Sequence, residues 1–108
     1  MDSKNEKKSP QKVLPGYLLQ LKAKEGKGEE IAKALRETIT NIEKEEGTIA
    51  WFGFRSSETD FGTFDVFTDE EARLLHREEG MERVKKLFPL VVENSIVIKE
   101  IDIISYKL

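Results

Sequence analysis

The sequence contains no cysteine, which excludes a disulfide framework and any metal site built from thiolates. It has a single histidine, His76, which is therefore the first side chain expected to titrate near neutral pH without a perturbed pKa. No apolar run approaches the roughly 18 residues of a membrane helix, and no apolar segment follows the N-terminal lysines. These absences predict a cytoplasmic protein with no membrane partner, in which any acid–base chemistry centres first on His76.

The length and charge of the chain indicate one acidic domain preceded by a short tail. A chain of 108 residues is too short for two domains that each bury a core. The net charge is −3, and because residues 1–16 carry +2, the body carries −5, which argues against a nucleic-acid partner. Residues 1–16 are polar and have no apolar face, so we expect a disordered or loosely tethered tail before a domain spanning 17–108.

The first half of the domain has the pattern of a strand, a helix and a hairpin. Residues 17–24 alternate in their second half, which is typical of a strand with one wet face. Apolar residues then recur at three- and four-residue spacing, which predicts an amphipathic helix that Gly47 ends as a left-handed cap. Two stretches rich in β-branched and aromatic residues follow, and the polar loop between them favours an antiparallel hairpin of residues 48–55 and 61–67.

The second half begins with a helix and ends with a strand. Thr68 and Glu71 have the spacing of a capping box, which predicts a helix start at this point. We expect Gly80 to break this helix and Pro89 to kink the chain near Phe88, because proline lacks an amide proton. Residues 96–106 are strongly β, but their alternation changes phase in the middle. A bulge, or an edge shared with a second subunit, would explain that change.

This order of elements predicts an α+β, ferredoxin-like fold. The plan is βαββαβ with a split or kinked second helix, and it gives a four-stranded antiparallel sheet with the helices on one face. Large aromatic residues occur at both odd and even positions of the hairpin strands, which point to opposite faces of the sheet. The face without helices would therefore also carry apolar groups. We therefore expect a homodimer that forms through this open sheet face, because exposed apolar surface costs roughly 25 cal/mol per Å².

Residues 17–108 resemble the antibiotic biosynthesis monooxygenase (ABM) domain family, a dimeric α+β barrel. The resemblance is carried by a glycine before the second strand, an aromatic and an arginine within it, an acid and an aromatic on the third strand, and an alanine and a histidine four apart. In this sequence these residues are Gly47, Trp51, Arg55, Asp65, Phe67, Ala72 and His76. Families with this fold include cofactor-free oxygenases of phenols or quinols, haem-degrading enzymes, isomerases and proteins without established activity, so the fold alone does not determine the chemistry.

The resemblance implies a candidate catalytic group of His76, Asp65 and Arg55. His76 would take a phenolic proton, and Arg55 would bind an anionic substrate or a developing phenolate. Asp65 stands where the family usually has the longer glutamate. The alternatives are a structural histidine that is hydrogen-bonded to Asp65 or to a backbone carbonyl, and an arginine in a surface ion pair. Candidate substrate-binding residues, whose alternative role is packing in the core or the dimer interface, are Trp51, Phe64, Phe67, Leu75 and Phe88.

The sequence predicts neither a cofactor nor a metal. One imidazole with carboxylates expected to cap a helix is a poor metal site. The haem-degrading relatives have an asparagine on the first strand and an iron-ligating histidine near the position of Lys86, and this chain has neither. Two functions remain open. One is a cofactor-independent monooxygenase that uses dioxygen on a small aromatic phenol or quinol, and the other is a non-catalytic, ligand-binding or stress-related dimeric ABM-like protein.

Overall fold

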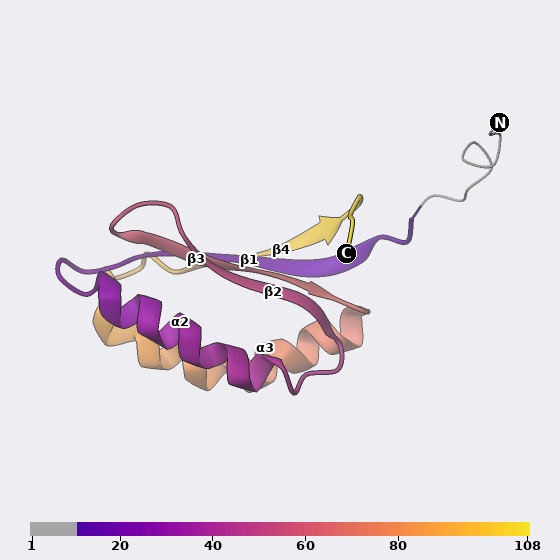
Figure 1. Cartoon of the computed structure of the whole chain (residues 1–108), viewed down its shortest axis with the longest axis horizontal. Helices are drawn as coiled ribbons and strands as arrows, with labels where there is room; N and C mark the ends of the chain where they lie inside the picture. The colour runs from indigo at the N-terminus through magenta and orange to yellow at the C-terminus, as the bar shows by residue number, and fades with distance from the viewer. Residues whose placement is uncertain (1–10) are drawn as a thin grey trace.

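A computed structural model describes residues 11–108, and its element order is that of the ferredoxin-like plan (Figure 1). The strands form one antiparallel sheet in the order β2-β3-β1-β4, and the two helices cover one face of it. This arrangement confirms the predicted α+β class and four-stranded sheet. The elements are β1 (Leu14–Lys22), α2 (Gly28–Ile42), β2 (Thr48–Arg55), β3 (Asp60–Phe67), α3 (Glu70–Leu87), the short 3-10 helix η1 (Phe88–Leu90) and β4 (Val97–Ile103).

The predicted boundary between tail and domain is wrong by several residues. The first ten residues of the expected tail, 1–16, lie outside the described residues, but β1 already begins at Leu14, whose side chain is buried. The segment before it is also tied to the domain. The side-chain amide of Gln11 donates to the backbone carbonyl of Tyr106 at 2.8 Å, and its oxygen accepts from the backbone N–H of Tyr106 at 3.2 Å. The ordered chain therefore starts before Tyr17.

Gly47 does not act as the left-handed helix cap that its sequence position suggested. α2 ends at Ile42, and the positive φ angles of the described chain fall on Gly26 and Asn94. Gly47 is required instead by close packing, because a Cβ atom there would overlap the Cβ of Ala72 on α3. Its carbonyl accepts a hydrogen bond from the backbone N–H of Thr68 at 2.9 Å. The glycine thus allows the start of α3 to approach the start of β2.

The start and course of α3 differ from the prediction, whereas its end agrees. Asp69, not Thr68, is the N-cap, and its carboxylate accepts from the Ala72 backbone N–H at 2.8 Å. The helix continues through Gly80 without a break. It ends at Leu87 and tightens into η1, because Pro89 cannot donate to a further helical turn.

The last strand is at the edge of the sheet and is regular. β4 pairs with β1 from Leu14↔Ile103 to Gln20↔Val97 without a register shift, so the bulge expected there is absent. The irregularity lies in β2 instead, between Thr48 and Ala50. The change of phase in the β4 sequence therefore reflects an edge strand that is partly exposed on both faces.

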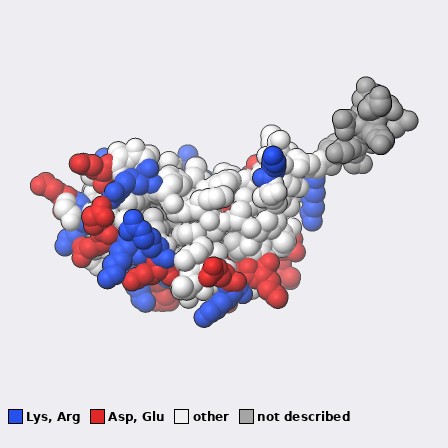
Figure 2. Space-filling model, viewed as in Figure 1, with Lys and Arg blue, Asp and Glu red and all other residues white. Residues whose placement is uncertain are grey.

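The two faces of the sheet have different surroundings. The face under the helices contributes to a core that includes Leu21, Ala23, Ile31, Phe61 and Val91. The opposite face carries apolar side chains that no helix covers, including Phe52, which is 56% exposed and stacks on Phe64 at 6.2 Å. Charged side chains gather over the helices, and the surface seen over the strands is mostly uncharged (Figure 2). No helix within residues 11–108 is long and apolar enough to cross a membrane.

Candidate functional site

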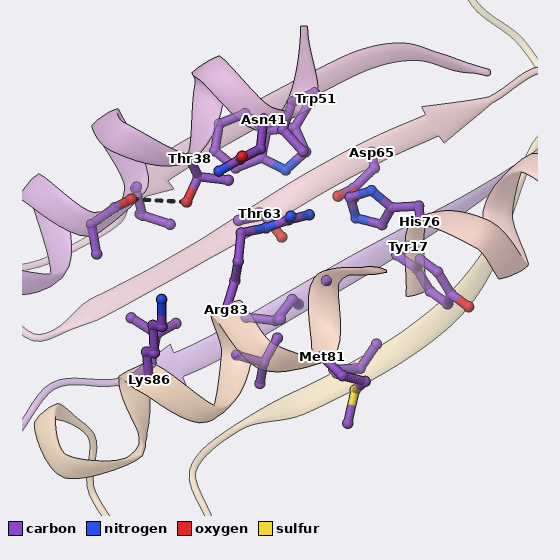
Figure 3. A pocket seen from close by; sticks show the side chains of 18 of the residues that line it. Tyr17, Thr38, Asn41, Trp51, Thr63, Asp65, His76, Met81, Arg83 and Lys86 are labelled. Carbon is purple, nitrogen blue, oxygen red and sulfur yellow. Dashed lines mark hydrogen bonds and ion pairs between the residues drawn. The ribbon is translucent and has the colours of Figure 1, made fainter. Parts of the chain in front are cut away.

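A cavity of about 280 Å³ lies between the sheet and the two helices. The strands contribute its floor and the helices its walls, and polar groups point into it from both sides (Figure 3). The apolar part of the lining includes Leu19, Leu35, Trp51, Val84 and Leu87. A space of about this size, with a mainly apolar surface and polar side chains from several elements, is typical of a site for a small ligand.

His76 lies at one end of this cavity and is held by two carboxylates. Its Nε2 is 2.9 Å from Asp65 Oδ2, and its Nδ1 is 2.7 Å from Glu45 Oε1. Because a carboxylate only accepts hydrogen bonds, both contacts are made fully when the ring is an imidazolium with two N–H donors. The imidazole also packs on the ring of Phe67, with centroids 5.0 Å apart. The geometry therefore favours the protonated ring.

The pKa of His76 is raised above its ordinary value. Burial, which leaves 13% of the side chain exposed, would by itself lower the pKa. The hydrogen bonds to Asp65 and Glu45 and the attraction of the two negative charges outweigh that effect and raise it. Both ring nitrogens contact carboxylates, so neither of them is free to accept a proton from a ligand.

Three separate segments bring these side chains together. Asp65 is in the middle of β3, opposite Trp51 of β2, and both side chains belong to the face under the helices. His76 lies in the second turn of α3, after the Asp69 cap. Glu45 comes from the turn that follows α2, where its Oε1 also accepts from the Thr48 hydroxyl at 2.7 Å. Sequence reasoning missed Glu45, because nothing distinguishes it from the other charged residues between 43 and 46.

One oxygen of Asp65 is left without a protein partner. The residue is 2% exposed and lines the cavity, but its Oδ1 makes no hydrogen bond within residues 11–108. The hydroxyl of Tyr17 is also unpartnered among the same residues, but it points away from the cavity in Figure 3. A buried carboxylate oxygen without a partner is costly, and an O–H or N–H group of a bound ligand would satisfy it.

Arg55 does not belong to this site, contrary to the prediction. Its guanidinium is 2.9 Å from Glu29 and lies over the ring of Phe61, 4.6 Å from the centroid. Arg55 pairs with Phe61 on β3, four residues before Asp65, which places its backbone about 13 Å away along the sheet. The alternative role, a surface ion pair, is the one observed.

The predicted substrate-binding residues separate into three groups. Trp51 lines the cavity together with Asp65 and His76, as expected. Phe67 is completely buried beside His76 and does not border the open space. The other three are not at the site: Phe64 stacks with Phe52 on the face away from the helices, and Leu75 and Phe88 are 53% and 56% exposed. Each of these three is next in sequence to a residue that does line the cavity. Phe64 lies between Thr63 and Asp65, Leu75 precedes His76, and Phe88 follows Leu87.

Nothing in the described chain gathers ligands for a metal ion. Residues 11–108 contain no group of three or more histidine, aspartate or glutamate side chains placed to hold one. The two carboxylates nearest to His76 bind its ring nitrogens instead. Lys86 also lines the cavity.

Several solved structures have a fold similar to that of this chain. No protein-family model matches the sequence, and no curated protein matches it. A protein of unknown function from Nitrosomonas europaea is 25% identical, with a TM-score of 0.76 over 89% of this chain and 94% of that one. A Caulobacter crescentus CB15 protein provisionally named an antibiotic biosynthesis monooxygenase is 16% identical, with a TM-score of 0.73 over 89% and 94%.

A second protein with that provisional name, from Nitrosomonas europaea, is 14% identical, with a TM-score of 0.71 over 85% of this chain and 89% of that one. The chain has an ABM-like fold. Identities this low relate folds and not reactions, so the chemistry has to be argued from the cavity.

Proposed function

We propose that the protein is a cofactor-independent monooxygenase that acts on a small aromatic phenol or quinol with dioxygen. The observation that carries this proposal is the buried Asp65, which lines the cavity together with Trp51 and whose Oδ1 has no hydrogen-bond partner within residues 11–108. An aromatic ring that stacks on Trp51 would bring a ring hydroxyl to this oxygen. The provisional names of the two structural neighbours add support of a general kind.

In this proposal Asp65 accepts the phenolic proton, and His76 holds Asp65 in place. The Nε2–H of His76 donates to Asp65 Oδ2, which keeps the carboxylate oriented with Oδ1 toward the ligand. This reverses the role first expected for His76, because both of its nitrogens are occupied by carboxylates. A hydrogen bond to Asp65 raises the electron density of the substrate ring, which favours electron transfer from the ring to dioxygen.

The overall reaction balances without another reductant. A phenol loses its hydroxyl proton and one ring hydrogen, and one atom of dioxygen enters the ring as a second carbonyl oxygen. The other oxygen atom leaves as water with those two hydrogens. The product is a quinone, and the aromatic substrate itself supplies all the electrons.

Oxygen uptake with naphthols, anthrols and dihydroxynaphthalenes tests this proposal, with autoxidation measured in buffer. Asp65→Asn keeps the shape of the side chain and removes the proton acceptor, so we expect turnover to fall about 100-fold or more. Asp60→Asn is the matched control, because Asp60 is on the same strand but pairs with Lys22 and Ser57 outside the cavity. Equal turnover in wild type and a folded Asp65→Asn variant would overturn the proposal.

A second candidate function is ligand binding without turnover. It is favoured by the two carboxylates on His76, which leave the site without a free neutral imidazole. Trp51 is the only tryptophan of the chain and lines the cavity, so its fluorescence reports an aromatic ligand directly. Quenching by phenols without any oxygen uptake would select this function. The absence of both signals across the panel would exclude both functions.

We also propose that the protein forms a homodimer through the open face of the sheet. The apolar side chains on this face include Phe52, Phe64 and Val97, and no part of the described chain covers them. A second copy has the same apolar face, so a two-fold pair of sheets would bury both at once. The resemblance to dimeric α+β barrels supports the same arrangement.

A further inference from the structure

Three cationic side chains of α3 border the cavity, although the protein as a whole is acidic. Arg77, Arg83 and Lys86 are all in its lining. In Figure 3, Arg83 points from α3 toward Thr63 and the floor of the cavity, and the amino group of Lys86 rises toward the same space. Arg77 and Lys86 are exposed, as lysine and arginine usually are, whereas Arg83 is half-buried and is the cation most closely tied to the cavity.

The acidic side chains near the cavity are mostly engaged with His76. Asp65 and Glu45 both contact its ring, and Glu37 is the other acidic residue among those that line the cavity. Arg77, Arg83 and Lys86 share this lining. A ligand with a negative charge would pair with these cations.

Most N–H donors of the Arg83 guanidinium have no ion-pair partner within the described chain. Its only ion pair within residues 11–108 is a single long contact, 3.5 Å from Nη2 to Glu45 Oε2, and the side chain is 25% exposed. A guanidinium carries five N–H donors in a planar fork that suits a carboxylate. Lys86 makes no ion pair with any residue of the described chain. Both groups are therefore available to a ligand.

We infer that the ligand of this cavity is a hydroxyaryl acid, with its hydroxyl group on Asp65 Oδ1 and its anionic group on Arg83 and Lys86. The inference rests on the proposed function for the presence of an aromatic ligand, but it does not require turnover. His76 and Arg83 are seven residues apart, about 10 Å along the helix axis. The guanidinium reaches back over Gly80, 3.3 Å from the position that a Cβ would have there, which shortens this span.

The residues thus divide the cavity into two ends. Asp65 is at one end and accepts a hydrogen bond, and a carboxylate placed there would be repelled. Lys86 is toward the other end, and Arg83 comes between His76 and Lys86 along α3, with its Nη2 3.5 Å from Glu45 Oε2. A flat ligand with its two polar groups at opposite ends fits this division, whereas a phenol without an anionic group leaves the cationic end unsatisfied.

Calorimetric titration with a matched pair of ligands tests the inference. 6-Hydroxy-2-naphthoate carries a hydroxyl and a carboxylate at opposite ends of one ring system, and 6-hydroxy-2-naphthamide has the same shape without the charge. We expect wild type to bind the acid about tenfold or more tightly than the amide, with a preference that weakens as salt is added. In Arg83→Gln the acid should lose most of this advantage while the amide binds as before, and Lys86→Gln should act in the same direction.

Lys85→Gln is the control for charge alone. Lys85 is next to Lys86 on α3, but it pairs with Glu82 and does not line the cavity. This variant should retain the preference for the acid. Thermal melts of every variant test whether it is folded. Equal affinity of wild type for the acid and the amide would overturn the inference and leave the proposed function intact. Failure of both ligands and of every uncharged phenol to bind would instead remove the proposed function.

Discussion

The Nδ1 of His76 lies 2.7 Å from Oε1 of Glu45, and this contact joins α3 to the turn after α2. The other nitrogen of the same ring reaches Asp65 on β3. One imidazolium therefore connects three segments that are distant in sequence. It also occupies one oxygen of each carboxylate, so that Oδ1 of Asp65 is the carboxylate oxygen of this cluster without a partner within residues 11–108.

The stability of the protein should depend on the protonation of His76. Its folded pKa is raised, so its contribution is fully present below about pH 6.5, the ordinary value in an unfolded chain, and is lost as the pH rises through the folded pKa. The free energy of unfolding should fall in this window by at most about 1.4 kcal/mol per pH unit. Urea unfolding over a pH series measures the slope.

The chain has no cysteine and no other histidine, so His76→Gln should remove this slope. The α-amino group titrates nearby but is present in both proteins and cancels in the comparison. A slope of the same size in the variant would show that another group is responsible.

Glu45→Gln should lower the pKa of His76 and destabilise the fold. The substitution keeps an oxygen for the Thr48 hydroxyl but removes the charge that faces Nδ1–H, and hydrogen bonds to charged groups contribute about 1.5–3 kcal/mol. NMR titration of the His76 ring protons gives the pKa, and urea unfolding gives the stability. Glu46→Gln is the matched control, because Glu46 is exposed and its side chain makes no hydrogen bond or ion pair within the described chain. An unchanged pKa in Glu45→Gln would contradict the observed pairing.

The sequence allowed the fold to be predicted well, because periodicity and turn residues are local signals. Both hairpin strands and the stop at Pro89 follow from such signals. The resemblance likewise identified Asp65, Trp51 and His76, which do meet at one cavity. What could not be predicted depends on long-range contacts.

Two residues illustrate this limit. Glu45 is significant only because the turn after α2 packs beside α3, and no local pattern reports that packing. Arg55 belongs to the same family pattern as Trp51. It lies four residues further along β2, however, where its guanidinium pairs with Glu29. Similarly, Leu75 is adjacent to His76 in sequence, yet a rotation of about 100° per helical residue turns it to the solvent.

Gly47→Ala should destabilise the protein through Ala72 and not through backbone strain. The new methyl group would overlap the Cβ of Ala72, and overpacking of this kind costs about 1–3 kcal/mol. Ala72→Gly alone should cost about 1 kcal/mol through helix propensity. The double variant should be more stable than the sum of the two losses predicts, because removal of one methyl makes room for the other. Strictly additive losses in urea unfolding would argue that these two residues do not limit each other.

Phe52→Glu should separate the proposed dimer. Phe52 is exposed on the open face in a single chain, and a second copy would bring its carboxylate into an apolar interface at a high desolvation cost. Sedimentation should show a monomer for this variant and a dimer for wild type. Leu74→Glu, at a similarly exposed residue on α3, should leave the dimer intact. A monomeric wild type, or dissociation only in Leu74→Glu, would refute the proposed interface.

Gly80→Ala should increase stability and decrease affinity for the hydroxyaryl acid. Alanine in the middle of a helix is favoured over glycine by about 1 kcal/mol, so the melting temperature should rise. The added methyl lies 3.3 Å from Nη2 of Arg83, which must move by a few tenths of an ångström away from its place over the cavity. We expect an affinity loss of a few-fold for 6-hydroxy-2-naphthoate and little change for the amide, measured by calorimetry.

The same substitution in the Arg83→Gln background separates the two ways in which the methyl could act. If Gly80 matters because it gives space to the guanidinium, the alanine costs no further affinity once that guanidinium is gone. If the methyl simply narrows the cavity, the loss persists in the double variant and affects acid and amide alike. The second result would assign Gly80 to the shape of the cavity and would remove its link to Arg83. The first would show that a glycine unfavourable to α3 is retained for the cation beside it.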